Sequence, residues 1–135
     1  MESQSRQPAD LERYVGKIAP SMTLDETITA YTTQWPYRDF AGQEMAMLLR
    51  TCNAALRRHD LHFSTSHTTL WIIREFEKQK QPPSKWIGVF TDGSNYELWL
   101  SSRNSQDTIN ENRTAHTKPE DAAESLGRFI TELVS

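Results

Sequence analysis

The stretch that decides the fold is KWIGVFTDGSNYELWLSS, residues 85–102. Two apolar runs, Trp86–Phe90 and Tyr96–Leu100, flank the polar segment Asp92–Asn95. An Asp-Gly pair between two such runs is a strong signal for a β-hairpin. We therefore expect a small antiparallel sheet built on this hairpin, with its two-residue turn at Asp-Gly or at the Gly-Ser that overlaps it.

Patterns on both sides of the hairpin predict helices, because apolar residues recur there at helical spacing. The helices expected before the hairpin cover about 9–19, 24–33, 39–58 and 66–79, and a closing helix covers 118–134. Helices followed by a small antiparallel sheet and a last helix are typical of the α+β class. We expect residues 1–7 to be a disordered lead-in and residues 8–135 to form a single globular domain.

Two segments are less clear in the sequence. Leu70, Ile73 and Phe76 have helical spacing, but 61–76 also alternates like a strand, from Phe63 to Ile73. A short apolar run permits both interpretations, and we favour the helix over 66–79, which Pro82-Pro83 would end. After the hairpin, the polar stretch 104–112 predicts a loop, and 113–117 predicts a short third strand.

The bulk composition excludes several classes of protein. The chain has 135 residues, 36% hydrophobic and 24% charged, which is typical of a folded domain rather than a disordered or membrane-embedded one. Cys52 is the single cysteine, so no internal disulfide forms, which is typical of a reducing compartment. Met1–Asp10 lacks the apolar core of a signal peptide. We expect a cytoplasmic protein without a membrane partner.

Both faces of the predicted hairpin carry large apolar side chains. One face holds Ile87 and Val89, opposite Tyr96, Leu98 and Leu100, and we expect it to pack against the closing helix. The other face holds Trp86, Phe90, Glu97 and Trp99. With the turn at Asp-Gly, Trp86 and Trp99 would lie directly opposite each other.

A sheet with one solvated face normally shows polar residues on it, and the Trp86 face does not. One explanation is that the N-terminal helices, with Trp35 and Tyr37, cover this face. The other is that it binds a partner, because aromatic patches with charged rims mark protein interfaces. The residues predicted for such a partner site are Trp86, Phe90, Trp99, Glu97, Lys85 and Arg103.

No motif for catalysis, metal or cofactor binding stands out. Cys52, His59, His62 and His67 match no standard zinc spacing. The five glycines form no phosphate-binding loop. We therefore expect no cofactor, no metal and no catalytic residues, and an enzyme of unrecognised type remains only as a second alternative.

Nucleic-acid binding is the first alternative. The predicted helices over residues 39–79 imitate a helix-turn-helix, and Arg57, Arg58, Arg74 and Lys78 would contact the phosphates. Against it, the formal net charge is −3, whereas nucleic-acid binders usually show a basic surface. The function predicted from sequence is a non-enzymatic protein-binding module of the inhibitor, immunity, adaptor or chaperone type. It would occlude a partner's surface or form a homodimer.

Overall fold

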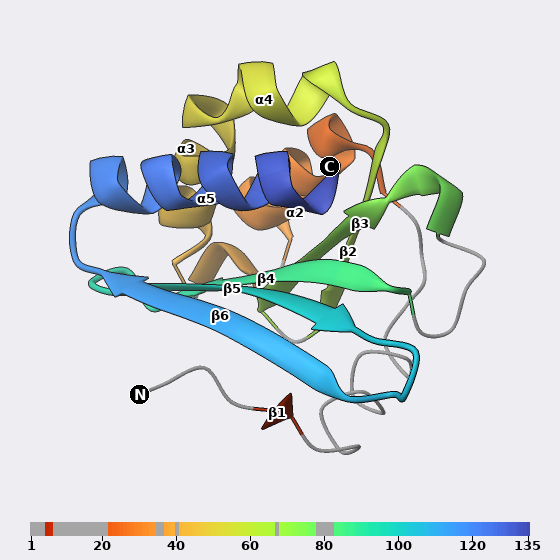
Figure 1. The fold of residues 1–135 in the computed structure, drawn as a ribbon. Helices are drawn as coiled ribbons and strands as arrows, with labels where there is room; N and C mark the ends of the chain where they lie inside the picture. Colours follow the sequence, from red (N-terminus) through yellow and green to blue (C-terminus); the bar gives the residue numbers. More distant parts are fainter. Residues whose placement is uncertain (1–4, 7–21, 35–36, 40, 67, 78–82) are drawn as a thin grey trace.

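The computed structural model describes most of the chain (Figure 1). The described residues are 5–6, 22–34, 37–39, 41–66, 68–77 and 83–135. Their helices are α2 (Leu24–Thr33), the 3-10 helix η1 (Tyr37–Asp39), α3 (Gly42–Thr51), α4 (Asn53–Arg58), the 3-10 helix η2 (Glu75–Glu77) and α5 (Pro119–Leu133). Their strands are β1 (Ser5–Arg6), β2 (Leu61–Ser66), β3 (Thr69–Arg74), β4 (Lys85–Thr91), β5 (Tyr96–Arg103) and β6 (Ile109–His116).

The strands form one antiparallel sheet in the order β1-β6-β5-β4-β3-β2. From β2 to β6 each strand pairs with the next strand of the sheet along the chain, so the sheet is a meander. β1 lies at the far edge, where Ser5 pairs with Asn110 and Arg6 with Ile109. Ser5 and Arg6, which lie within the segment expected to be a lead-in, form this short strand, and the rest of 1–7 lies outside the described residues. The predicted helix 9–19 lies outside the described residues.

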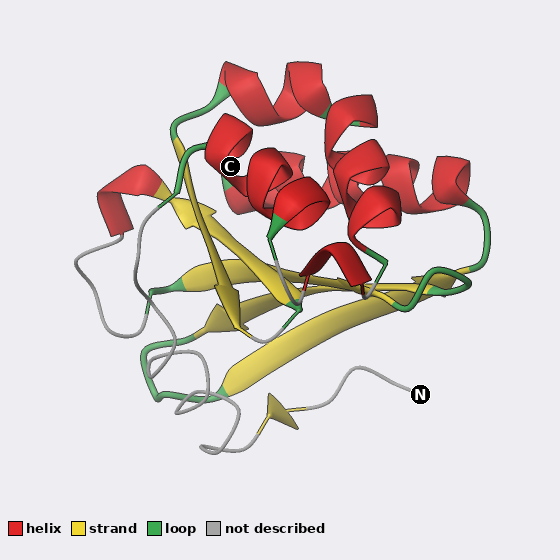
Figure 2. Ribbon diagram, turned by 180° about the vertical axis from the view of Figure 1, so that it is seen from behind, coloured by secondary structure: helices red, strands yellow, loops and turns green. Residues whose placement is uncertain are grey.

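The helices α2, α3, α4 and α5 lie on the same face of this sheet, as Figure 1 and the opposite view in Figure 2 show. Between them and the sheet lies the larger apolar core, to which α3 contributes Leu48 and Leu49 and α5 contributes Leu126 and Phe129. Helices grouped on one face of an antiparallel sheet define the α+β class. The predicted class is confirmed.

Helix α2 begins and ends where the sequence predicts, at Leu24 and Thr33. Its N-cap, Thr23, forms a capping box: the Glu26 amide donates to the Thr23 hydroxyl at 3.1 Å, and the Thr23 amide donates to the Glu26 carboxylate at 2.9 Å. Two helix-end amides that would otherwise lack an acceptor are satisfied in this way. Local chemistry alone fixes this boundary.

The long helix expected over 39–58 is interrupted, so that prediction is correct only in part. The chain makes η1, then α3, and then leaves helical geometry at Cys52, where ψ is 14°, before α4 begins. Both α3 and α4 contact α5. The break at Cys52 therefore lets two short helices face the closing helix with their apolar sides.

The α-helix expected over 66–79 is wrong, because the described part of this stretch consists mainly of β3, which pairs with β2 in a hairpin, and the 3-10 helix η2. Phe63 pairs with Ile72 and Thr65 with Leu70. β3 is an inner strand, and its residues Leu70–Ile73 are buried on both faces of the sheet. A strand buried on both faces has a continuous apolar run instead of a strict alternation, which is why its pattern also fits a helix.

The β4–β5 hairpin confirms the prediction over 85–102 and selects one of its two registers. Thr91 pairs with Tyr96, so the chain turns at Gly93-Ser94, where Gly93 has a φ of +97°. The Asp92 carboxylate accepts hydrogen bonds from the backbone amides of Ser94 and Asn95, at 2.9 and 2.8 Å. Ile87 and Val89 face the helices as predicted.

The last strand is longer than the sequence indicates. β6 starts at Ile109 and not at residue 113, so the loop expected over 104–112 is shorter. The Asn104 side chain closes that loop, because its oxygen accepts from the amides of Gln106 and Thr108. The closing helix α5 agrees with its prediction to within one residue at each end.

Candidate functional site

The face of the sheet opposite the helices carries a second apolar cluster. We call it the aromatic face; it consists of Trp71, Ile73, Trp86, Trp99 and Ile109, with Phe90 packed against them. The described helices α2, α3 and α4 lie on the other face, so they do not provide the cover expected from the N-terminal helices. Trp35 and the side chain of Tyr37 lie outside what the structure describes.

A row of paired residues crosses the aromatic face from strand to strand. Trp71 on β3 pairs with Gly88 on β4, and Gly88 pairs with Trp99 on β5. The Trp99 ring lies directly over Gly88, so that a Cβ added at Gly88 would overlap the ring. Trp71 and Trp99 meet edge to face, with ring centroids 5.6 Å apart. Gly88 therefore provides the space that the Trp99 indole occupies.

The row ends on β6 at Arg113, which pairs with Trp99. The Arg113 guanidinium lies 4.4 Å from the centroid of the Trp99 ring, which is a cation–π contact. Two carboxylates hold it there: Glu111 accepts from Nε at 2.7 Å, and Glu97 accepts from Nη1 at 3.2 Å. The rim of the aromatic face is therefore a fixed charged group stacked on an indole.

The partner-site residues predicted from sequence fall into three places. Trp86 is fully buried and Trp99 is 6% exposed, whereas Phe90 is half-buried and Glu97 is exposed. Lys85 reaches toward the helices, because its Nζ donates to the Glu132 carbonyl of α5 at 3.0 Å. The structure thus gathers the two tryptophans, Phe90 and Glu97 on the aromatic face, and it places the Lys85 amine elsewhere.

Arg103 lies at the end of β5, where its guanidinium pairs with Asp107 of the adjacent loop at 2.7 Å. Three members of the site, Trp71, Glu111 and Arg113, were missed by sequence reasoning. Their role depends on which residues lie opposite each other in the sheet, and the sequence left that register open.

The helix-turn-helix expected over residues 39–79 does not form, because its second helix is the β2–β3 hairpin. Arg57 is exposed at the end of α4, but it pairs with Asp25 and donates to Asn53 at 2.6 Å. The Arg74 guanidinium lies 4.6 Å from the centroid of the Phe76 ring. Arg58 is exposed beside Arg57, and Lys78 lies outside the described residues. These cations do not line a helix that is presented to a groove.

A serine–histidine pair links α5 to β6. The Nε2 atom of His116 lies 2.7 Å from the Ser125 hydroxyl, to which Arg128 also donates at 3.1 Å. A nucleophile must be reachable by its substrate, and Ser125 is only 1% exposed. We interpret this pair as a polar contact that holds the closing helix against the edge of the sheet.

Cys52 is buried between α3, α4 and α5, and its thiol donates to the Ala123 carbonyl at 3.4 Å. Burial raises the pKa of the Cys52 thiol to about 11. A nucleophilic or metal-binding cysteine needs a low pKa, because the thiolate is the reactive form. The thiol is therefore part of the core, and among the described residues no three His, Cys, Asp or Glu side chains are grouped as metal ligands would be.

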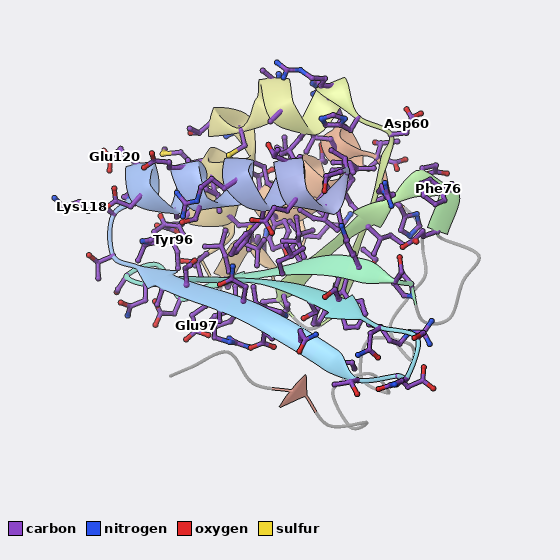
Figure 3. The ribbon with its side chains drawn as sticks, in the orientation of Figure 1. Asp60, Phe76, Tyr96, Glu97, Lys118 and Glu120 are labelled. Atoms are coloured by element: carbon purple, nitrogen blue, oxygen red, sulfur yellow. The ribbon has the colours of Figure 1, made fainter. Side chains whose placement is uncertain are left out.

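A pocket of about 560 Å³ lies beside β2, which is at the opposite edge of the sheet from β1. It lies between the start of α2, the end of α4, the strand β2 and the start of η2. Its apolar lining is Met22, Leu24, Leu56, Leu61 and Phe63, and its polar lining is Thr23, Glu26, Arg57, His59, Asp60 and Glu75. Sequence reasoning missed this site, whose residues come from three separate segments of the chain, 22–26, 56–63 and Glu75. Figure 3 shows Asp60 at the end of α4, and Glu97 on the side of the sheet away from the helices.

Comparison with protein-family models, with curated proteins and with solved structures found no match. The class that the described residues define is an α+β protein whose antiparallel sheet has helices on one face. Within those residues, no helix has both the length and the apolar character needed to cross a bilayer. Any function must therefore be argued from the surfaces of this chain.

Proposed function

We propose that this chain is a protein-binding domain that acts by covering a surface of its partner. The observation behind the proposal is the charged rim of the aromatic face, where Arg113 stacks on Trp99 between Glu97 and Glu111. Arginine and tryptophan are the residue types that most often anchor protein interfaces. Arg113 is also held in place before binding, which lowers the entropy that binding would cost.

Among the described residues, the strand that bears Arg113 has a neighbour on its outer side for only part of its length. Among the described residues, β1 pairs with β6 only at Ile109 and Asn110. From Asn112 to His116 no described strand lies on the outer side of β6, and alternate backbone groups of an edge strand point outward. An extended segment of a partner can therefore add to the sheet here and meet the Arg113 rim at the same time.

The side chains of this edge also favour selectivity. Glu97, Arg113 and Asn112 are exposed around it, and charged edge strands resist unspecific pairing. A partner strand must therefore offer matching polar groups. We include a second copy of the chain among the partners in the proposal, since two β6 edges related by a twofold axis would form a homodimer.

The proposal places the protein in the cytoplasm. Cys52 is a free thiol in the core, and cytosolic thiols stay reduced. Partner capture should therefore be carried out under reducing conditions.

The test uses a photocrosslinking amino acid in place of Ala115, which is exposed on β6, in the cell that produces the chain. The matched control carries it in place of Met47, which is 58% exposed on α3. We expect one discrete adduct from position 115, none from position 47, and loss of the adduct when Arg113→Ala is added. An adduct of twice the chain mass would identify the homodimer. Equal adducts from both positions, or none from position 115, would contradict the proposal.

A further inference from the structure

The pocket beside β2 has the size and the lining of a ligand site. At about 560 Å³ it lies within the range of roughly 300–1,000 Å³ that is usual for small-ligand pockets. Leu56 and Phe63 are each 2% exposed and form part of its apolar floor. Asp60 is exposed at the rim, so a ligand can reach both the floor and the charged groups.

The charges around the pocket favour a cation. Three carboxylates line it, from Glu26, Asp60 and Glu75, against the single guanidinium of Arg57. That guanidinium pairs with Asp25, which is not part of the lining, so a fourth carboxylate already neutralises it. Glu26 and Asp60 still leave the rim negative, and opposite charges favour association.

The pocket lies at the N-terminus of α2, a position that in other helices attracts anions. Here that end of the helix is already occupied. The Thr23 hydroxyl accepts from the Glu26 amide, and the Glu26 carboxylate accepts from the Thr23 amide. An anionic ligand would have to displace a carboxylate of the chain, whereas a cationic ligand would find that carboxylate at the rim.

We propose that this pocket binds a basic side chain of a partner protein, lysine or arginine, next to an apolar residue. The apolar residue would lie on the Leu56 and Phe63 floor, and the cation would meet Asp60 and its neighbouring carboxylates at the rim. The pocket is beside β2, whereas the Arg113 rim is beside β6 at the other side of the sheet. This site is therefore separate from the surface of the proposed function, and one can fail without the other.

The test is a titration of the full ¹⁵N-labelled chain, followed by NMR, with three acetylated tripeptide amides. The probes are Leu-Arg-Leu, Leu-Gln-Leu and Leu-Glu-Leu. They differ only in the central side chain, which is positive, neutral or negative. We expect the arginine probe to bind with a dissociation constant on the order of 1 mM and to shift the amides of Leu24, Asp60 and Leu61. The glutamine probe should bind several-fold more weakly, and the glutamate probe should cause no shift at these amides.

Two variants locate the binding. Asp60→Asn removes an exposed charge at the rim of the pocket. It should lower the affinity for the arginine probe about threefold, as expected for the loss of one solvent-exposed ion pair. Asp121→Asn, which removes an exposed carboxylate in the first turn of α5 and outside the lining, should leave its affinity unchanged. The spectrum without peptide shows whether each variant is folded.

The proposal is wrong if the three probes bind equally, if the shifts map away from the pocket, or if Asp60→Asn has no effect on a folded protein. Added salt provides an independent check. Affinity for the arginine probe should fall as salt screens the rim, while affinity for the glutamine probe should stay constant. These outcomes do not depend on crosslinking at Ala115.

Discussion

The two faces of this sheet are both buried, but by different means. On one face, aliphatic side chains such as Ile87 and Val89 pack under α2, α3, α4 and α5. On the other, three tryptophans pack along the sheet itself, with Trp99 lying flat over Gly88 and Arg113 lying over Trp99. The first core is formed between the helices and the sheet, and in the second the described contacts join residues of neighbouring strands of one sheet.

Because the two faces are packed differently, we expect them to be sensitive to different kinds of substitution. A core between helices and a sheet depends on filled volume, so cavities weaken it in proportion to the atoms removed. A core of stacked rings depends on which residues lie opposite each other, so one added methyl group at the wrong position disturbs it. The following four predictions test this contrast, beginning with the largest expected effect.

Trp86→Ala should lower the free energy of unfolding by about 3–5 kcal/mol, because the indole is fully buried. Leu98→Ala, at a fully buried position on the helix-covered face, should cost about 2–5 kcal/mol. Urea denaturation measures both. If Trp86→Ala costs less than about 1 kcal/mol, a typical value for an ordinary substitution, the aromatic face is not a second core.

Gly88→Ala should destabilise by about 1–3 kcal/mol, because the new Cβ would overlap the Trp99 ring and the ring must move. Tryptophan fluorescence should change in the folded state as well. Gly127→Ala is the matched control, since nothing lies within 4 Å of its added Cβ on α5. It should stabilise the protein by about 0.5–1 kcal/mol through helix propensity. Equal effects at both glycines would refute the role given to Gly88.

Arg113→Ala should lower the free energy of unfolding by about 1 kcal/mol, because it removes an exposed cation–π contact together with two ion pairs. Arg50→Ala, at an exposed position near the end of α3, should change stability by less than about 0.5 kcal/mol. Thermal denaturation of the two variants gives the comparison. A larger effect at Arg50 would mean that the stack on Trp99 contributes little.

The last prediction concerns pH and the helix-covered face. Burial raises the pKa of the Cys52 thiol from 9.0 to about 11, so the folded chain keeps a proton that the unfolded chain releases. The stabilisation from this proton is complete below pH 9 and is lost as the pH rises toward 11. Cys52→Ala should therefore show a shallower fall in unfolding free energy over this range. Identical slopes for the two proteins would contradict the shift.

The sequence predicted those elements whose ends are set by local chemistry. Thr23 and Glu26 cap α2, and the Gly93-Ser94 turn, held by the Asp92 carboxylate, closes the β4–β5 hairpin, so neither depends on distant residues. The β2–β3 hairpin was missed because its connection between Ser66 and Thr69 lacks Gly, Pro, Asn and Asp, the usual turn residues. Its inner strand also lacks alternation, since both of its sides are buried.

The candidate sites were less predictable than the elements. The aromatic composition of one hairpin face was visible, but its register was not, because two turn positions were equally compatible with the sequence and only one of them places Trp99 over Gly88. The Arg113 stack was missed because it depends on the separate pairing of β5 with β6, which begins in a stretch that the sequence predicts as a loop. The pocket was not visible at all, since the residues that line it meet only after the β2–β3 hairpin brings Asp60 and Glu75 together.

The isolated bridge between Met22 and Phe63 has a consequence for self-association. Met22 exchanges both backbone hydrogen bonds with Phe63, in the middle of the outer side of β2. A filament formed by edge-to-edge sheet pairing needs two unpaired edge strands on every molecule, so that each molecule can pair with one copy on each side. With β2 obstructed at its centre, copies that pair through β6 as proposed would find no second open side among the described strands. Growth would then stop at a closed pair.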